Sequence, residues 1–134
     1  MKTVKTDIFL GVYLKNNPNF TGIVIDRFQD KCWVVKGNLH REDGPAIEYY
    51  HKERKDWYQN NELHREDGPA IEWADGYKAW YRNGKLHREE GPAIEDSENP
   101  EQNEYHLEGQ FYSKEGWANK MRERKLSQFL DKDK

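Results

Sequence analysis

Short runs in which apolar and polar residues alternate recur along most of the chain, and many of them end at Gly, Asn or Asp. Alternation of this kind is typical of half-buried β-strands, and the residues that end the runs favour turns. Segment 71–80, IEWADGYKAW, is the clearest example, because Asp75-Gly76 is a strong signal for a two-residue hairpin turn. We therefore predict a β-hairpin here, with Ile71 opposite Trp80.

A ten-residue segment, LHREDGPAIE, occupies 39–48 and again 63–72, and the variant LHREEGPAIE occupies 86–95. Its isoleucines (Ile47, Ile71 and Ile94) are spaced by 24 and 23 residues, and the aromatic residue that follows each recurs at a similar distance. A period of about 23 residues indicates a repeat architecture. Three repeats are clear, and a degenerate one lies at each end.

The other repeats admit the same kind of hairpin. A Gly or Asn four residues after each aromatic predicts a further turn or bulge, because these residues tolerate positive φ. The HRED-GP and HREE-GP segments then form a corner into the next strand. The predicted fold is mainly β, an antiparallel β-meander of about four to five repeated hairpins with one C-terminal α-helix. The other predicted pairs and loops are Ile47 with Trp57 (51–53), Ile25 with Trp33 (28–30) and Ile94 with Tyr105 (99–100).

Alternation along the strands assigns side chains to two faces of the predicted sheet. We expect the core face to carry Ile47, Ile71, Trp57, Trp80, Leu63 and Leu86. We expect the outer face to carry Ala46, Ala70, Tyr58, Tyr81 and the acids Glu48, Asp56, Glu72 and Glu95.

The whole chain, 1–134, is predicted to be a single domain with 22–112 as the repeats. Residues 1–21 are expected to add one or two strands. Residues 113–130 predict a helix capped by Ser113, with Trp117 and Met121 on one stripe and a second apolar cluster after it. This helix is expected to cover the sheet, or else to protrude as an interaction helix. The tail 131–134 is expected to fray. The second cluster is Leu126, Phe129 and Leu130.

Composition narrows the class of protein. The 134 residues are 34% hydrophobic and 35% charged, and 22 basic against 25 acidic residues leave a net charge of -3. A slightly negative chain lacks the excess of basic residues that is typical of proteins that bind nucleic acid. Cys32 is the only cysteine and no apolar run approaches a membrane span, so we expect a cytoplasmic protein without membrane association, located in the host cytoplasm if phage-encoded.

The plan W-Y-x-N-G-K-L-H, followed by a glycine corner and the Trp73-Ala74-Asp75-Gly76 turn, resembles the MORN repeat. The resemblance covers about residues 22–112. It is greatest to a variant with HREDGPA at the corner, found in uncharacterised bacterial, phage and large-virus proteins. Arg41, Arg65 and Arg88 replace the glycine that usually follows the His. The resemblance implies an extended antiparallel sheet that serves as a scaffold or binding surface, often for proteins and sometimes for phospholipids.

The repeated histidines His40, His64 and His87 raise the question of a zinc site. Equivalent positions in successive hairpins lie two strands apart, about 9.5 Å, which is too far for a shared metal ion. The His, Arg and acidic residues that could form a catalytic site also occur three times, whereas an enzyme ordinarily has one unique set of catalytic residues in a pocket. We therefore expect no metal, no cofactor and no catalysis, with a buried, inert thiol at Cys32. A hydrolytic or metal-dependent enzyme remains the alternative.

The charged residues of the corner have a structural interpretation and a functional one. In the first, Asp43 and Asp67 accept backbone hydrogen bonds, and the corner arginines pair with a carboxylate of the next repeat. In the second, an outward strip recognises a partner, since Tyr and Arg are favoured at interfaces. The residues of that strip are His40, Tyr58, His64, Tyr81 and His87.

Segment 95–104, EDSENPEQNE, is the longest and most acidic predicted loop. It is either a solvated loop or an acidic finger that docks on a basic groove, with Glu98, Glu101 and Glu104 in contact. The favoured function is a non-catalytic protein-binding module, plausibly a small phage or prophage accessory protein that inhibits a host protein such as a defence-system effector. The second is a MORN-like scaffold on membrane lipid. An uncovered sheet edge favours a homodimer.

Overall fold

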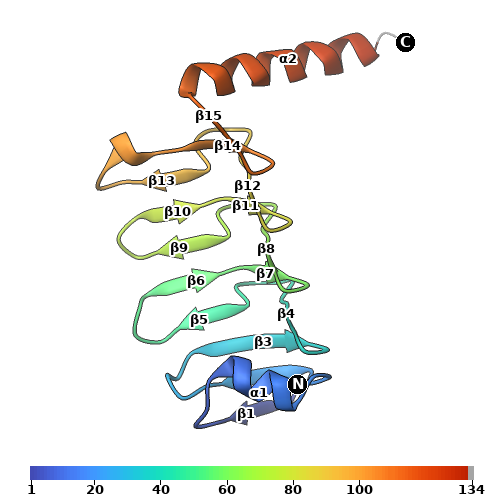
Figure 1. Ribbon diagram of the computed structural model, residues 1–134, viewed down its shortest axis with the longest axis vertical. Helices are drawn as coiled ribbons and strands as arrows, with labels where there is room; N and C mark the ends of the chain where they lie inside the picture. The colour runs from blue at the N-terminus through green and yellow to red at the C-terminus, as the bar shows by residue number, and fades with distance from the viewer. Residues whose placement is uncertain (133–134) are drawn as a thin grey trace.

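The computed structural model describes residues 1–132, and within them the chain is mainly β with a helix near each end. The repeats pack on one another to form an elongated array, which we call the stack (Figure 1). Antiparallel hairpins and the C-terminal helix confirm the predicted fold class.

One long sheet, the main sheet, runs through the stack. Apart from β1, which is parallel to β2, its neighbouring strands are antiparallel. Pairing within a repeat alternates with pairing between repeats, so the sheet is continuous from one repeat to the next. Its strands in spatial order are β1 (Thr3–Lys5), β2 (Gly22–Ile25), β3 (Lys31–Val35), β5 (Ile47–Tyr49), β6 (Arg54–Asp56), β9 (Ile71–Trp73), β10 (Tyr77–Ala79) and β13 (Ile94–Asp96).

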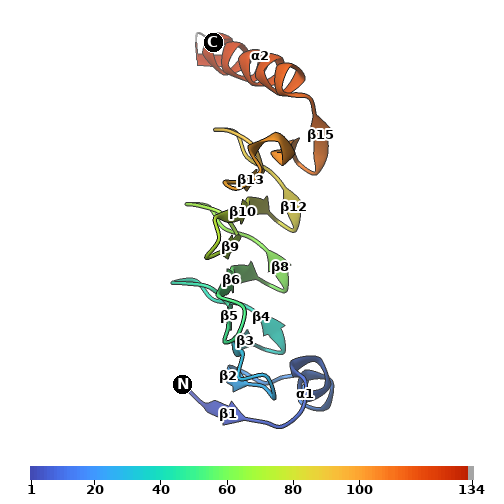
Figure 2. The same cartoon turned by 90° about the vertical axis from the view of Figure 1, so that its left-hand side faces the viewer.

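A second row of short hairpins lies beside the main sheet (Figure 2). Both residues of each hairpin turn have positive φ, as at Asn83 (50°) and Gly84 (77°), which is the type I′ geometry that matches the twist of the strands. The turn predicted four residues after each aromatic is therefore confirmed. The row comprises β3 with β4 (Asn38–Leu39), β7 (Tyr58–Gln59) with β8 (Glu62–Leu63), β11 (Tyr81–Arg82) with β12 (Lys85–Leu86), and β14 (Tyr105–Leu107) with β15 (Gln110–Tyr112).

The predicted register of the main-sheet hairpins is wrong. Ile71 lies opposite Ala79 instead of Trp80, because the connection is the three-residue loop 74–76 and not a two-residue turn. Gly76, with φ of 97°, supplies the left-handed residue that completes a loop of this length. The other predicted pairs fail likewise. Ile47 lies opposite Asp56, Ile25 opposite Lys31, and Ile94 bridges to Glu104.

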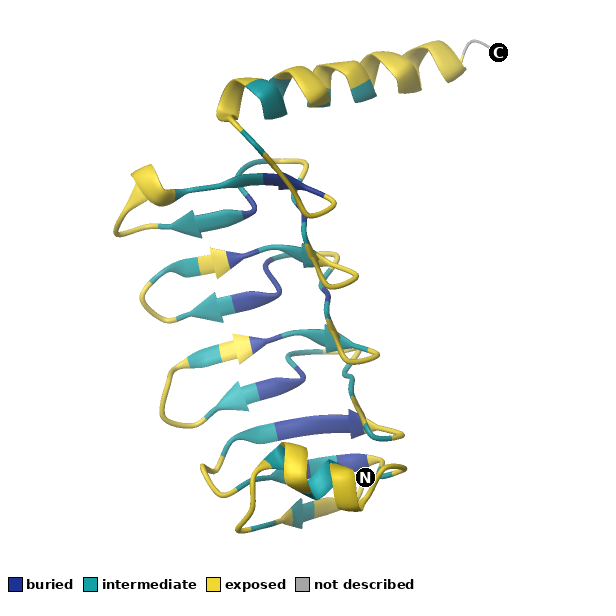
Figure 3. Ribbon diagram, in the orientation of Figure 1, coloured by how far each residue is buried: buried dark blue, intermediate teal, exposed yellow. Residues whose placement is uncertain are grey.

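A one-residue change of register moves side chains to the other face of a sheet, and the predicted faces change accordingly. Asp56, Ala46 and Ala70, all predicted on the outer face, are 0% exposed. Ile47 and Ile71 are buried as predicted, whereas the tryptophans predicted beside them are only half-buried. The buried residues concentrate where the main sheet meets the row of hairpins (Figure 3).

The N-terminal segment 1–21 contains one strand and an unpredicted helix. β1 pairs in parallel with β2, and α1 (Leu10–Asn16) lies in the connection between them. The single strand agrees with the expected one or two, and α1 is the kind of crossover that parallel neighbours need. Phe9 and Val12 on this segment remain 48% and 46% exposed.

The C-terminal helix, α2 (Lys114–Lys132), lies across the end of the stack rather than over the sheet (Figure 1). Ser113 caps it as predicted, because the Gly116 N–H donates to the Ser113 Oγ at 3.0 Å. The first turns pack on the last hairpin, where the Trp117 ring lies 5.0 Å from that of Tyr105. Of the tail predicted to fray, 131–132 belong to α2 and 133–134 lie outside the described residues.

Candidate functional site

The repeated decapeptide forms the corner between a short hairpin and the next main-sheet strand. At each corner an arginine lies over the tryptophan that precedes it, with the guanidinium 3.8, 4.0 and 3.6 Å from the ring centroid in successive repeats. The same guanidinium donates to the proline carbonyl oxygen at 3.0–3.1 Å. The stacked pairs are Arg41 with Trp33, Arg65 with Trp57 and Arg88 with Trp80.

Each corner arginine was predicted to pair with a carboxylate of the next repeat, and the carboxylate it pairs with is the one that ends its own decapeptide. Nitrogen to oxygen distances are 3.4 Å for Arg41 and Glu48 and 3.0 Å for Arg65 and Glu72. The pair Arg88 and Glu95 is looser, at 3.9 Å. Asp43 and Asp67 were expected to accept backbone hydrogen bonds, but they accept from the Nε of the corner arginine at 3.0 and 2.9 Å. A single guanidinium thus joins the tryptophan, the proline and the acids of its corner.

The corner histidines join one repeat to the next. The Nδ1 atoms of His40, His64 and His87 accept backbone N–H groups of the following hairpin turn at 3.1, 3.0 and 3.0 Å. Because Nδ1 accepts, the ring proton is on Nε2, which faces the glutamate two residues later. His64 and His87 are only 8% and 7% exposed, so the predicted outward histidine strip is wrong. These rings hold successive repeats together by hydrogen bonds and are not a free recognition surface.

Within residues 1–132, no group of three or more His, Cys, Asp or Glu side chains is arranged to hold a metal ion. Burial raises the pKa of the Cys32 thiol to about 12, and the predicted burial of this side chain is confirmed. In every copy the corner arginine and histidine each lie within 4 Å of a carboxylate.

A cluster of aromatic side chains surrounds a buried ion pair on one side of the main sheet. Asp56, which is fully buried, accepts from the Nε and Nη2 atoms of Arg54 at 2.7 Å each, and from the Tyr49 hydroxyl at 3.1 Å. The Arg54 guanidinium lies 5.1 Å from the Tyr49 ring and 5.2 Å from the Trp73 ring. The ion pair therefore fixes a cation between two aromatic rings.

Three more tyrosines, Tyr58, Tyr77 and Tyr81, extend this cluster, and we call the whole set the aromatic face. Burial raises the pKa of all three hydroxyls. Each ring is partly covered, yet among residues 1–132 no hydrogen-bond partner is present for any of these hydroxyls. A half-buried ring with an unpaired hydroxyl can add both contact area and a hydrogen bond to a partner.

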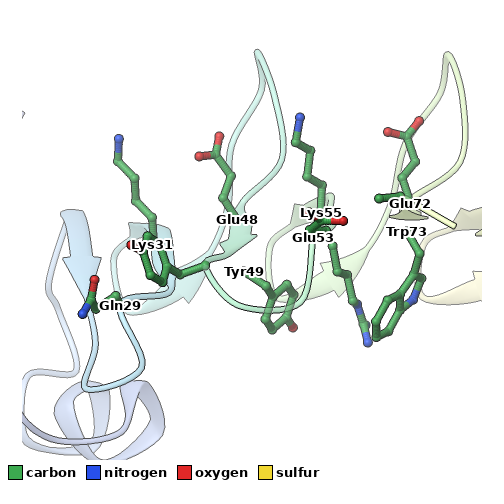
Figure 4. A pocket seen from close by; sticks show the side chains of 11 residues that line it. Gln29, Lys31, Glu48, Tyr49, Glu53, Lys55, Glu72 and Trp73 are labelled. Atoms are coloured by element: carbon green, nitrogen blue, oxygen red, sulfur yellow. The ribbon is translucent and has the colours of Figure 1, made fainter.

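The opposite side of the main sheet carries a ladder of alternating charge, which we call the charged face. Figure 4 shows Lys31, Glu48 and Lys55 projecting to one side with Glu72, while Tyr49 projects to the other. Register explains the order, because Lys31 lies opposite Glu48, and Glu48 opposite Lys55. Lys78 lies opposite Glu72 and Glu95, which continues the ladder. Opposite charges alternate along the row, so this face has no strong sign.

The acidic loop, residues 95–104, contains the short 3-10 helix η1 (Pro100–Gln102). Asp96 organises it by accepting the backbone N–H of Glu98 at 3.0 Å. Glu98 and Glu101 are exposed, whereas Glu104 faces His106 at 2.8 Å and is not a free contact residue. A hollow of about 460 Å³ joins the loop to the aromatic face, with Trp73 and Tyr77 in its lining.

Of the eight predicted contact residues, Tyr58 and Tyr81 reach the aromatic face and Glu98 and Glu101 are accessible beside it. Sequence reasoning missed Tyr49, Arg54 and Trp73, because the wrong register hid their common face. No described helix is long and apolar enough to cross a membrane. Comparison with protein-family models, with curated proteins and with solved structures finds no match to this chain.

Proposed function

We propose that the chain is a non-catalytic protein-binding module whose aromatic face binds a segment of a partner protein. The observation that carries this proposal is the buried Arg54–Asp56 pair, which holds Tyr49 and Trp73 in place beside tyrosines with unpaired hydroxyls. Tyr, Trp and Arg are the residues most often found at the energetic centre of interfaces. Because the cluster is already ordered, little conformational entropy is lost when a partner binds.

The charge around the aromatic face indicates the chemistry of the bound segment. The hollow beside Trp73 and Tyr77 is also lined by Asp75, Asp96 and Glu98. Arg54 in the same hollow is already neutralised by Asp56. A segment with Lys or Arg side chains would therefore meet carboxylates and aromatic rings together, and both attract a cation.

The resemblance to repeat proteins of phages supports a more specific proposal, in which the partner is a host protein that the module inhibits. A module of this kind acts by occupying a basic surface of its target. Electrostatic attraction between the acidic loop and that surface would accelerate association more than it would lower the dissociation rate.

The proposal is tested by affinity capture from a lysate of the native host cell, with bound proteins identified by mass spectrometry. We expect Trp73→Ser and Tyr81→Ser to lose a partner that the wild-type chain retains. The matched controls Lys55→Ser and Lys78→Ser alter the charged face of the same repeats and should retain it. A partner that is lost with the lysine variants and retained by the aromatic variants would overturn the proposal.

A further inference from the structure

The helix α2 has two apolar stripes on opposite sides. Trp117 and Met121 are partly covered by the stack, whereas Leu126, Phe129 and Leu130, the outer cluster, are 61%, 64% and 55% exposed. Leu126 follows Trp117 by nine positions, which is roughly two and a half helical turns. Leu126 and, one turn later, Leu130 therefore point away from the stack that the first half of the helix contacts, and Phe129 is exposed beside them.

The middle of α2 is held to the stack and prevents the outer cluster from turning inward. The Arg124 guanidinium lies 3.2 Å from the Glu89 carboxylate and 3.7 Å from that of Glu108. The Trp117 Nε1–H donates to the Arg88 carbonyl oxygen at 3.2 Å. With these contacts in place, no other segment within residues 1–132 covers the outer cluster.

Basic residues border the outer cluster. Arg122 lies one helical turn before Leu126, and Lys125 directly precedes it. Both are exposed, and neither forms an ion pair among residues 1–132. Lys132 adds a further positive charge at the last turn. The surface that fits this half of α2 is therefore both apolar and acidic.

Such a surface lies on the last repeat of the same protein. A hollow of about 480 Å³, the acidic hollow, is lined by Tyr77, Ile94 and Phe111 together with Asp96, Glu101 and Glu104. Phe111 is 59% exposed, which leaves a second large apolar side chain uncovered at this end of the chain. In Figure 1 the tip of α2 extends to the opposite side of the stack from the loop after β13, so the helix does not reach the acidic hollow of its own chain.

We propose that the chain forms a two-fold dimer in which the second half of α2 from each copy lies in the acidic hollow of the other. A two-fold axis near the end of the stack makes the two helices antiparallel and carries each tip to the side on which the partner has its acidic loop. Both contacts are then equivalent, and each pairs apolar with apolar side chains and basic with acidic ones. Pairing of α2 with α2 alone would place the basic borders side by side, which repel.

Dimerisation through α2 replaces the dimer expected from sheet edges. The free edge at the N-terminal end is β1, only three residues long, which offers few hydrogen bonds to a second chain. The two-fold dimer adjoins the aromatic face at Tyr77 and Asp96, which line both hollows, and leaves Tyr49, Trp73 and Glu98 outside the acidic hollow. It does not depend on the function proposed above, and it would present two aromatic faces to a partner.

The test is sedimentation equilibrium of the full chain with two charge-reversed proteins. One carries Arg122→Glu and Lys125→Glu on α2, and the other carries Glu101→Lys and Gln102→Lys in the acidic hollow. All four side chains are exposed, so the fold should persist, as circular dichroism would verify. We expect a wild-type dimer, at least about tenfold weaker dimers for each variant alone, and a restored 1:1 heterodimer when the two are mixed.

The apolar contribution is tested by Phe129→Ser, which should weaken the dimer by about tenfold or more. Tyr50→Ser is the matched control, because Tyr50 is 62% exposed and lies outside the acidic hollow and α2, and it should leave the dimer intact. The proposal is overturned by a wild-type chain that stays monomeric at all concentrations. It is equally overturned by a dimer that the acidic-hollow variant leaves unchanged, or by a mixture that forms no heterodimer.

Discussion

Replacement of Asp56 by Ala should destabilise the protein more than any other removal of a single carboxylate. Asp56 is fully buried and accepts two hydrogen bonds from Arg54 and one from Tyr49. Removal of one partner from a buried ion pair typically costs about 3–5 kcal/mol, because the remaining charge is left without compensation. The Arg54 side chain is 25% exposed, so water solvates part of it and the lower end, about 3 kcal/mol, applies.

The chain contains its own control for this prediction. Asp43 also accepts from the Nε of an arginine two residues away, Arg41, but its side chain is 87% exposed. Its replacement by Ala should change stability by no more than the error of the measurement. The assay is urea unfolding followed by tryptophan fluorescence, with the free energy extrapolated to water. If D56A loses no more stability than D43A, the argument from burial is wrong.

Three further predictions concern the stack. Burial lowers the pKa of His87, so the free energy of unfolding should fall as the pH drops below about 6.5, the ordinary histidine pKa in the unfolded chain. Urea titrations at about pH 7.5 and about pH 5.5 should show this loss, and H87N should reduce it. Gly84→Ala should lower the free energy of unfolding by roughly 1–2 kcal/mol in the same assay, because Gly84 has positive φ. Gly37→Ala should lower it by well over that amount, because Gly37 also has positive φ and a Cβ there would collide with the Pro18 carbonyl oxygen. Because burial raises its pKa to about 12, Cys32 should react with a thiol reagent at about pH 8 only after unfolding in urea.

Much of the stack was predictable from the repeat itself. The 23-residue period, the turns four residues after each aromatic and the corners at HRED-GP all follow from residues whose backbone preferences are local. The cap at Ser113 is equally local, since a hydroxyl three residues before the Gly116 N–H needs no distant partner. The pairing of Arg65 with Glu72 is local too, because both belong to one corner and the strand it leads into.

The register was not predictable, because the length of a hairpin loop is decided by the packing of its strands. A loop at 74–76 of three residues instead of two exchanged the faces of the sheet. In the preceding hairpin, the loop 50–53 places Arg54 opposite Tyr49 and Asp56 opposite Ile47, so that Tyr49, Arg54 and Asp56 share one face. The aromatic face, which carries the proposed function, thus depends on the lengths of these hairpin loops.

The sequence by itself determined that this protein is a stack of β-hairpins ending in a helix, since turns, corners and caps depend on nearest neighbours along the chain. Only the tertiary structure decided the roles of the repeated histidines, because their Nδ1 atoms bind backbone groups about 20 residues away in the next repeat. It also decided that α2 ends the stack and leaves Phe129 uncovered. Contacts between distant segments depend on how the repeats pack, and local preferences do not specify that packing.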